Sequence, residues 1–249
     1  MKRDIERYAK EYVAEEYGFE RVMRRYRHKK VHESLQQFKA LHVLEIGCGP
    51  NSLAERYNQY ERFVIVEPSQ DFCAMVKASS AYGPGVEIIP DVVENQFTRL
   101  REMRFDFIIL SSLLHEVHEP RQMLRGLHAL CGPGTILHVN VPNAESFHFL
   151  WAKEAGLIDK IGAQSEQFTK LQQTSIFTLS SLIAMLEEEG FVILEQGSYF
   201  IKPFNHAKMQ KALEIGLLDN PLLDGLYALS SRFPAAGAEI FANCRVARS

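Results

Sequence analysis

The sequence predicts an α/β protein with a doubly wound, mostly parallel sheet, helices at its N-terminus and helical insertions late in the chain. Short apolar runs alternate with helical segments from residue 41 onward, and such strand–helix–strand repetition implies right-handed crossovers with helices on both faces of a sheet. The runs are apolar almost throughout, as expected for parallel strands buried on both sides. The alternation stops after Pro142, where long helical stretches follow.

Length and composition set the limits of this prediction. The chain has 249 residues, of which 46% are hydrophobic, so one large α/β domain has enough apolar side chains for its core. A net charge of −3 argues against a protein whose whole surface binds nucleic acid. No run approaches the roughly 20 apolar residues that cross a bilayer, and the start, MKRDIERYAKEY, lacks the apolar centre of a signal peptide. The four cysteines have neither metal-ligand nor disulfide spacing. We therefore expect a cytoplasmic protein with no bound metal and no membrane partner.

The first forty residues predict an N-terminal helical cap (1–40), because polar positions with interspersed aromatic ones are typical of amphipathic helices. Within it, residues 21–30 read RVMRRYRHKK. Such a run favours the solvated face of a helix. The alternative is an anion-binding role toward a cofactor carboxylate, a substrate phosphate or an RNA backbone.

The core of the predicted sheet spans residues 41–142. Its strand candidates are rich in β-branched and aromatic residues. They lie at 42–46, 63–67, 86–90, 105–110 and 135–141. The segments between them are long enough for crossover helices, at 52–60, 71–80, 95–103 and 120–130.

Residues 143–249 combine helical lid insertions with the last strands of the same domain. Residues 143–173 are helical in character, a helix then ends at Gly190 before a strand, and a helical stretch at 206–233 precedes the strand at 239–246. We expect the insertions to cover the carboxyl edge of the sheet, where ligands bind in doubly wound folds.

The stretch LHVLEIGCGPNS contains a strand that ends in a glycine turn. Gly47 and Gly49 flank Cys48, and glycine lets backbone turn sharply and approach a ligand closely. This turn predicts a nucleoside- or phosphate-binding site. The dinucleotide fingerprint would place a third glycine where the chain has Ser52. Glu45 beside the turn would repel a pyrophosphate, which favours a cationic ligand.

Two further carboxylates follow strands at the same edge of the sheet. Glu67 ends the second strand, where an acidic side chain accepts hydrogen bonds from ribose hydroxyls, and Asp91 follows the third. The alternatives are an ordinary strand-end carboxylate for Glu67 and a helix N-cap for Asp91.

The motifs EIGCGP, VIVEPS, IIPDVV, FDFIILSSLLHEV and LCGPGTILHVNVPN together resemble those of class I S-adenosylmethionine-dependent methyltransferases. The resemblance is strongest to the small-molecule type that includes the ubiquinone and menaquinone methyltransferases, and it covers residues 41–142. It implies a seven-stranded Rossmann-like sheet and S-adenosyl-L-methionine as the cofactor. The cofactor is a sulfonium cation with an ammonium group and no phosphates, which agrees with a carboxylate at Glu45.

The resemblance also implies roles for individual residues. Around the methionine moiety it places Glu45, Gly47, Cys48 and Gly49. It assigns the ribose to Glu67, the edge of the adenine pocket to Pro68 and Ser69, the adenine amino group to Asp91 and the face of the ring to Val92. Under the cofactor it places Ser111 and Leu113. From the basic run we assign Arg25 to the cofactor carboxylate, with Arg24 and Lys29 as alternatives. Cys48 is interpreted as a small residue that fits, not as a catalytic thiol.

Methyl transfer to oxygen or nitrogen is an in-line displacement. Positioning of the nucleophile supplies up to roughly 7–11 kcal/mol, whereas a general base adds a factor of about 10²–10⁴. If a base is used, we assign it to His115, whose ordinary pKa near 6.5 suits proton removal at neutral pH. The alternative for His115 is a pocket wall. Glu116, His118 and His148 are expected near the same site.

We expect a small-molecule acceptor. The segments VPNAESFHFLWAKEAGLI and YFIKPFNHAKMQ resemble uncharacterised bacterial methyltransferases associated with surface-glycan or sugar-nucleotide pathways, which makes a sugar or glycan precursor the favoured acceptor. Phe147 and Phe204 would line its pocket or bury the lid. The alternatives are an RNA methyltransferase, although no RNA-binding module accompanies the basic run, and a non-catalytic S-adenosylmethionine-binding subunit of a heteromer. A homodimer stays open.

Overall fold

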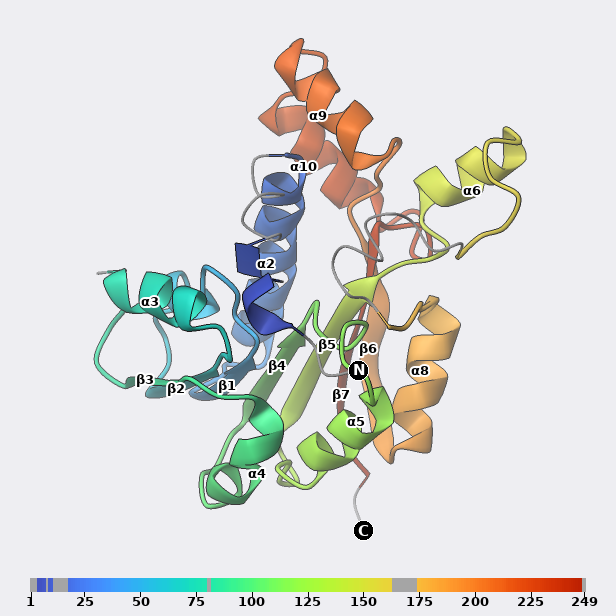
Figure 1. The fold of residues 1–249 in the computed structure, drawn as a ribbon. Coiled ribbons are helices and arrows are strands. Elements are labelled where there is room, and N and C mark those ends of the chain that lie inside the picture. The colour runs from blue at the N-terminus through green and yellow to red at the C-terminus, as the bar shows by residue number, and fades with distance from the viewer. Residues whose placement is uncertain (1–3, 8, 11–17, 80–81, 163–173, 248–249) are drawn as a thin grey trace.

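The computed structural model describes residues 4–7, 9–10, 18–79, 82–162 and 174–247. In this part of the chain, seven strands form one sheet in the order β3-β2-β1-β4-β5-β7-β6. The strands are β1 (His42–Ile46), β2 (Arg62–Val66), β3 (Val86–Ile89), β4 (Phe107–Ser111), β5 (Ile136–Pro142), β6 (Phe191–Tyr199) and β7 (Glu239–Val246). The pairings among β1 to β5 are parallel, whereas β7 is antiparallel to both β5 and β6. The predicted doubly wound, mostly parallel sheet is confirmed (Figure 1).

Five of the helices in the described residues cover the two faces of the sheet: α2 (Glu20–Gln37), α3 (Gln70–Ala78), α4 (Val93–Arg101), α5 (Pro120–His128) and α8 (Leu179–Glu188). Helices α6 (Phe147–Glu154), α9 (His206–Glu214) and α10 (Asn220–Leu229) lie away from these faces (Figure 1). Side chains alternate along each strand, so Leu44 and Val43 enter different cores. Leu44 packs in the core covered by α4, α5 and α8, and Val43 packs in the core covered by α2 and α3.

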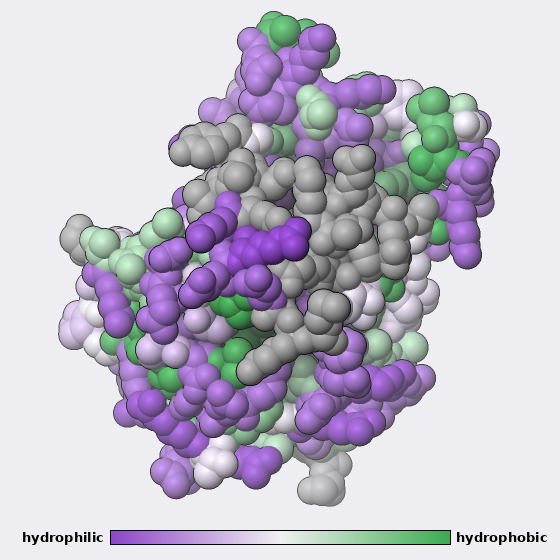
Figure 2. Space-filling view, viewed as in Figure 1, coloured by the Kyte–Doolittle hydropathy of each residue, from purple (hydrophilic) through white to green (hydrophobic). Residues whose placement is uncertain are grey.

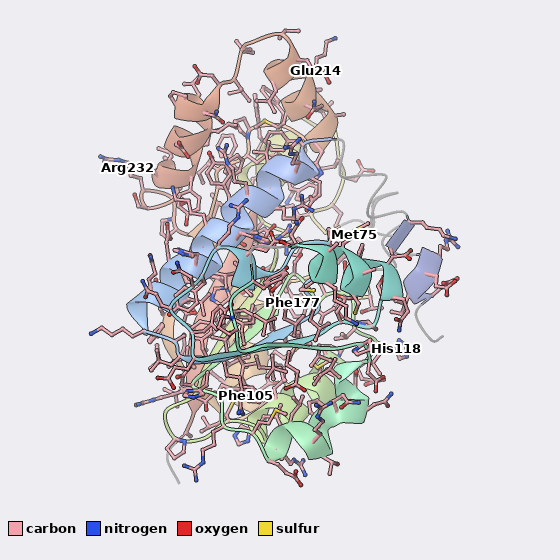
Figure 3. All side chains as sticks on the ribbon, turned by 90° about the vertical axis from the view of Figure 1, so that its left-hand side faces the viewer. Met75, Phe105, His118, Phe177, Glu214 and Arg232 are labelled. Atoms are coloured by element: carbon pink, nitrogen blue, oxygen red, sulfur yellow. The ribbon has the colours of Figure 1, made fainter. Side chains whose placement is uncertain are left out.

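A third apolar cluster joins α2 to α9 and α10 beyond the carboxyl edge of the sheet. Tyr26 of α2 is fully buried and packs on Phe200, with ring centroids 4.7 Å apart. Met209 of α9 and Leu223 of α10 complete this cluster. Figure 3 shows Glu214 and Arg232 at the outer end of this helical layer, and Phe105, just before β4, at the opposite end of the sheet. The N-terminal helix and the late insertion therefore form one layer at the ligand edge.

Helix α6 has a different environment. It leaves the end of β5 and projects from the body of the molecule (Figure 1), and its tip forms an apolar patch on the surface (Figure 2). Phe147 and Trp151 are 40% and 48% exposed, and Trp151 contacts Phe204 in a tilted arrangement with ring centroids 5.3 Å apart. These aromatic residues are thus not buried in a core.

The segment 52–60, expected as a crossover helix, contains only the 3-10 turn η1 (Leu53–Glu55). Two hydrogen bonds to the buried carboxylate of Glu45 hold its first turn, one from the backbone amide of Leu53 and one from the hydroxyl of Ser52. The hydroxyl of Tyr57 donates to the carbonyl of Ala40 at 2.6 Å, which ties the segment to the end of α2. The chain then reaches β2 without a longer helix.

None of the helices in the described residues combines the length and the apolar character that crossing a bilayer requires. Part of the insertion expected at 143–173, namely residues 163–173, lies outside the described residues.

Candidate active site

A cavity of about 480 Å³ opens at the carboxyl ends of β1, β2 and β4. Its volume falls in the range of about 300–1,000 Å³ that small-molecule and cofactor sites occupy. The turn after β1, the end of β2, the start of α4 and the loop after β4 all line it, and α2 contributes a wall. Nine of the twelve residues assigned to the cofactor lie on its surface: Glu45, Gly47, Cys48, Gly49, Glu67, Pro68, Val92, Ser111 and Leu113.

Both glycines of the turn after β1 have backbone dihedral angles in the left-handed region. Gly47 has a φ of +71° and Gly49 a φ of +61°, a conformation that L side chains rarely adopt. A Cβ on Gly47 would also lie 3.1 Å from Leu113 Cδ2, on the loop after β4. The amide of Gly47 donates to the carbonyl of Val66 at 2.9 Å, so the turn begins as a continuation of the β1–β2 ladder. The glycines therefore shape a backbone cradle at the cavity.

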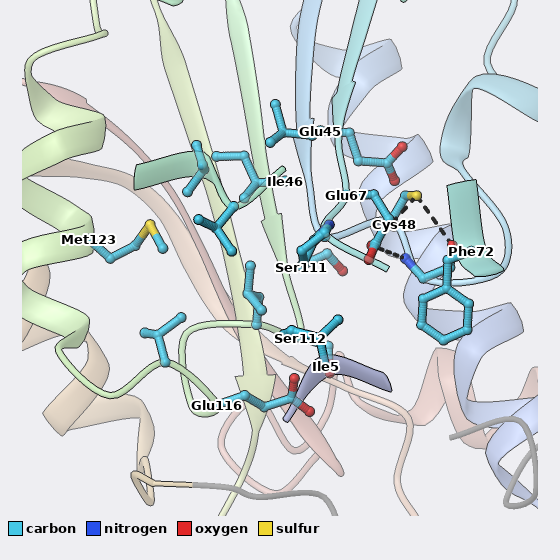
Figure 4. A pocket seen from close by; sticks show the side chains of 18 of the residues that line it. Ile5, Glu45, Ile46, Cys48, Glu67, Phe72, Ser111, Ser112, Glu116 and Met123 are labelled. Atoms are coloured by element: carbon cyan, nitrogen blue, oxygen red, sulfur yellow. Dashed lines mark hydrogen bonds between the residues drawn. The ribbon is translucent and has the colours of Figure 1, made fainter. Parts of the chain in front are cut away.

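Glu67 connects this cradle to the end of β2. One of its carboxylate oxygens accepts from the amide of Gly49 at 3.1 Å, and the other accepts from the amide of Ser69 at 2.8 Å. The side chain is 4% exposed and lines the cavity (Figure 4). Ser69 itself is the N-cap of α3 and does not line the cavity.

Glu45 is buried beneath the same turn. Burial raises the pKa of its carboxyl group to about 7, although the hydrogen bonds from Ser52 and Leu53 act in the opposite direction. Burial, together with Glu45 and Glu67, also raises the pKa of the Cys48 thiol. A protonated thiol agrees with the interpretation of Cys48 as a small residue that fits.

The loop after β4 is shaped by Asn140 of β5, which the sequence analysis did not single out. Ser112 has a φ of +53°, and its amide donates to the side-chain oxygen of Asn140 at 3.0 Å and to the Asn140 carbonyl at 2.9 Å. The Asn140 side chain also donates to the hydroxyl of Ser111 at 2.9 Å. In the sequence, the available signal for this role was Asn140 itself, a polar residue near the end of the mostly apolar run TILHVNV.

Asp91 and Arg25 do not line the cavity. The carboxylate of Asp91 accepts hydrogen bonds from the Val92 amide and from the side chains of Asn95 and Gln96, all within 2.8 Å, and these bonds lower its pKa. Asp91 precedes Val92, the N-cap of α4, so it is not the N-cap of the alternative interpretation, but its hydrogen bonds hold the first turn of that helix. Arg25 faces α10, where it donates to Asn220 at 2.8 Å.

The rest of the basic run also has partners within the chain. The ammonium of Lys29 lies 4.4 Å from the Tyr227 ring centre, and that of Lys30 lies 3.5 Å from Glu195. Arg24, Arg27 and His28 instead line the cavity, and burial lowers the pKa of His28 to about 3. The run is therefore not a uniformly solvated helix face.

Arg27 lies in a buried polar network behind the cavity wall. Its guanidinium binds the carboxylate of Glu239 on β7 and that of Glu20, the latter at 3.1 Å. Tyr199 at the end of β6 also donates to Glu239. The network connects α2 to the far strands of the sheet.

The loop after β4 brings Glu116 to the cavity, on the wall across from Glu45 and Glu67 (Figure 4). Glu116 is 5% exposed. His115 is 3% exposed and does not line the cavity, but its Nε2 lies 3.7 Å from Oε1 of Glu116. His118 lines the cavity with a side chain that is 70% exposed. The segment is a turn, not a helix, and it places the side chains of His115 and Glu116 next to each other.

This fold and this site define a class I S-adenosylmethionine-dependent methyltransferase. The donor set fits the cofactor, because the carboxylates and the glycine cradle suit a cationic amino acid and a ribose. A family model described as a methyltransferase domain matches residues 16–196, and the chain belongs to that family. The ubiquinone and menaquinone subtype stays a prediction.

Solved structures with the same fold have little sequence identity to the chain. A Thermotoga maritima enzyme described as a possible histamine N-methyltransferase has a TM-score of 0.55 and 18% identity, covering 91% of this chain and 97% of its own. A 1,6-didemethyltoxoflavin-N1-methyltransferase from Burkholderia thailandensis, solved with S-adenosylhomocysteine, has a TM-score of 0.54 and 14% identity, covering 89% and 79%. The [4+2]-cyclase SpnF has a TM-score of 0.51 and 17% identity, covering 84% and 75%. No curated protein sequence matches the chain significantly. The structural likeness alone therefore establishes the fold and not the acceptor.

Proposed function

We propose that the chain transfers the methyl group of S-adenosylmethionine to a nitrogen or oxygen of a small-molecule acceptor. One observation carries this proposal. A single cavity has the glycine cradle and Glu67 on one side and the carboxylate of Glu116 on the opposite wall (Figure 4). The cofactor would occupy the first side, and the acceptor would approach from the second.

The residues at the cofactor side have chemistry that suits the parts of S-adenosylmethionine. The carboxylate of Glu67 lines the cavity at the end of β2, and a carboxylate is the group that accepts hydrogen bonds from ribose hydroxyls. Glu45 offers a carboxylate for the ammonium group, directly or through water. We assign the adenine ring to Val92, since Val92 lines the cavity and Asp91 does not. Arg24 replaces Arg25 in our assignment to the cofactor carboxylate, because only Arg24 lines the cavity.

At the acceptor side we assign Glu116 to the acceptor. Its carboxylate would accept a hydrogen bond from the acceptor's N–H or O–H and so direct a lone pair toward the methyl group. His115 would act through Glu116 as a positioning residue, because it lies behind that carboxylate. The cofactor supplies the methyl group, and orientation of the nucleophile supplies most of the rate.

Small acceptors are favoured over RNA for a physical reason. Arg25, Lys29 and Lys30 have partners within the chain, so the basic run offers no continuous stripe for a phosphate backbone. The names of the two methyltransferases compared above also point to small nitrogen compounds. A sugar or surface-glycan precursor remains our favoured acceptor from the sequence.

The test is a screen for S-adenosylhomocysteine release with a panel of small amines, hydroxy acids and sugars. With the acceptor found, Glu116→Gln should keep S-adenosylhomocysteine affinity and lose about 10²-fold or more in kcat. His115→Asn should lower kcat and change its pH profile. Glu119→Gln is the matched control, because that side chain is 68% exposed and close in sequence. Cofactor binding with no turnover on any acceptor would favour the non-catalytic subunit, and full activity in Glu116→Gln would remove its assignment.

A further inference from the structure

Two chain segments meet at the carboxyl edge of the sheet beside the cavity, and together they carry three basic side chains. His148 lies in the first turn of α6, after β5, and Lys202 and His206 lie in the segment that leads from β6 into α9. We call these three residues the basic cluster. The three side chains are close enough to interact electrostatically, since Lys202 and His206 both lower the pKa of His148. The cluster adjoins the cavity through Arg27, which lines it and also acts on His206.

Lys202 is the central member of the cluster. It is 7% exposed, and within the described ranges no atom lies at hydrogen-bond or ion-pair distance from its ammonium. The carboxylates in its neighbourhood are engaged elsewhere. Glu239 accepts from Arg27 and Tyr199, and Glu20 binds Arg27 and lies 3.9 Å from His206 Nε2. Among the described residues, the Nζ of Lys202 is not one of the fully enclosed unpaired atoms, so it keeps some contact with the space outside the protein, from which a ligand could reach it.

The ionisation of the cluster agrees with an anionic ligand. Burial lowers the pKa of Lys202 to about 8, so it is charged at neutral pH. Burial and then Lys202 lower the pKa of His206 to about 3 and of His148 to about 2, so both imidazoles are neutral. A neutral imidazole keeps one N–H donor. The Ser146 hydroxyl lies 2.9 Å from Nδ1 of His148 and, when it donates there, leaves the Nε2–H of that imidazole available, whereas Nε2 of His206 lies 3.9 Å from Glu20. The cluster thus offers one cation and the N–H of His148, with His206 beside them, a set that suits the oxygens of a carboxylate or a phosphate.

We propose that Lys202, with His148 and His206, binds an anionic group of the methyl acceptor, a carboxylate or a phosphate. This inference rests on the proposed function and specifies the acceptor's chemistry. The anionic group would lie between α6, α9 and α2, while the nucleophile reaches the cavity near Glu116. Lys202 would then gain the acceptor that its surroundings do not provide.

The chain carries its own reporter for this site. Trp151 is its only tryptophan, and its ring contacts that of Phe204, two residues after Lys202. Inorganic phosphate and acetate, titrated separately into the full chain at constant ionic strength, should each change Trp151 fluorescence in a saturable way if their chemistry fits. The tighter of the two identifies the kind of anionic group.

Lys202→Met is the decisive variant, and Lys208→Met is its matched control. Lys208 is exposed on α9, with its ammonium 6.0 Å from the Phe204 ring centre. We expect Lys202→Met to weaken anion binding at least tenfold and Lys208→Met to leave it unchanged. Without the anion, Lys202→Met should melt at the same temperature as the wild type or higher, because the substitution removes a mostly buried cation that has no hydrogen bond to lose within the described residues. Lys202→Gln provides the same comparison if the methionine variant does not fold.

Two results would overturn the inference. One is a linear, unsaturated response to both anions, equal in all variants, which would indicate a general ionic effect. The other is a clear loss of thermal stability in both Lys202 variants, which would show that Lys202 balances Glu20 and Glu239 within the fold. Titration with S-adenosylhomocysteine separates this inference from the proposed function. If no variant and no wild-type protein binds it, the proposed function fails, and the anion titration is judged on its own.

Discussion

A carboxylate oxygen of Glu67 accepts a hydrogen bond from the backbone amide of Gly49 at 3.1 Å. The end of β2 is therefore joined directly to the glycine turn that follows β1. Gly49 has a left-handed φ of +61°, and the bond holds its amide toward the carboxylate. In the proposed function the same side chain would hold the ribose, so one residue would both shape the cradle and bind the ligand.

Replacement of Glu67 should therefore affect both functions. We expect Glu67→Ala to weaken S-adenosylhomocysteine binding by about 1–3 kcal/mol, the usual scale for losing a hydrogen bond to a charged group. Isothermal titration calorimetry measures this change. Glu61→Ala is the control, because that side chain is 68% exposed at the start of the same strand. An unchanged affinity in folded Glu67→Ala would contradict the assignment to the ribose.

The glycine turn predicts a graded series of alanine variants. Gly134→Ala should be neutral, since a Cβ there has open space and the φ is not left-handed. Gly49→Ala should cost about 1–2 kcal/mol of folding stability through its φ alone. Gly47→Ala should cost more, because its Cβ would also lie 3.1 Å from Leu113. Chemical denaturation gives the order, and equal losses in all three variants would contradict it.

The stability of the chain should depend on pH through Glu45. Its folded-state pKa of about 7 lies above the ordinary value of 4.5, so the folded state binds the proton more tightly than the unfolded state. The stabilising effect of protonation is complete below pH 4.5 and is lost as the pH rises to 7. Relative to Glu45→Gln, the wild type should lose on the order of 3 kcal/mol across this range. Denaturation curves of both proteins at several pH values test this, and parallel pH profiles would disprove it.

Replacement of Arg27 on α2 should cost much more folding stability than replacement of Arg25, two residues earlier on the same helix. Arg27→Met leaves Glu239, which is 2% exposed, without its main cationic partner and should cost about 3–5 kcal/mol of folding stability. Arg25→Met removes an exposed pair with Asp224 at 3.9 Å and should cost less than about 1 kcal/mol. Urea denaturation of the two variants measures the difference. Similar losses would mean that the buried network does not contribute as described.

The sequence was sufficient to predict the sheet, and nine of the twelve residues that it assigned to the cofactor line the cavity, where their role stays a prediction. Strands that are buried on both faces consist of continuous apolar runs in the sequence, and a sharp turn with a left-handed backbone conformation requires glycine. Both signals are local, so Glu45, the glycine turn and Glu67 could be located without the fold. The crossover expected at 52–60 was wrong because its conformation depends on a distant contact, the hydrogen bonds to Glu45.

Only the tertiary structure decided which side chains face the cavity and which serve the fold. Arg24 and Arg25 are adjacent in sequence, yet successive residues on a helix point about 100° apart, so one lines the cavity and the other faces α10. The same holds for His115 and Glu116 in the turn after β4. Lys202 has no signal in its own segment, because its burial beside His148 and His206 arises from segments that meet only in the folded chain. Local patterns determine elements, whereas the direction of a side chain and its charge environment are set by packing between distant parts of the sequence.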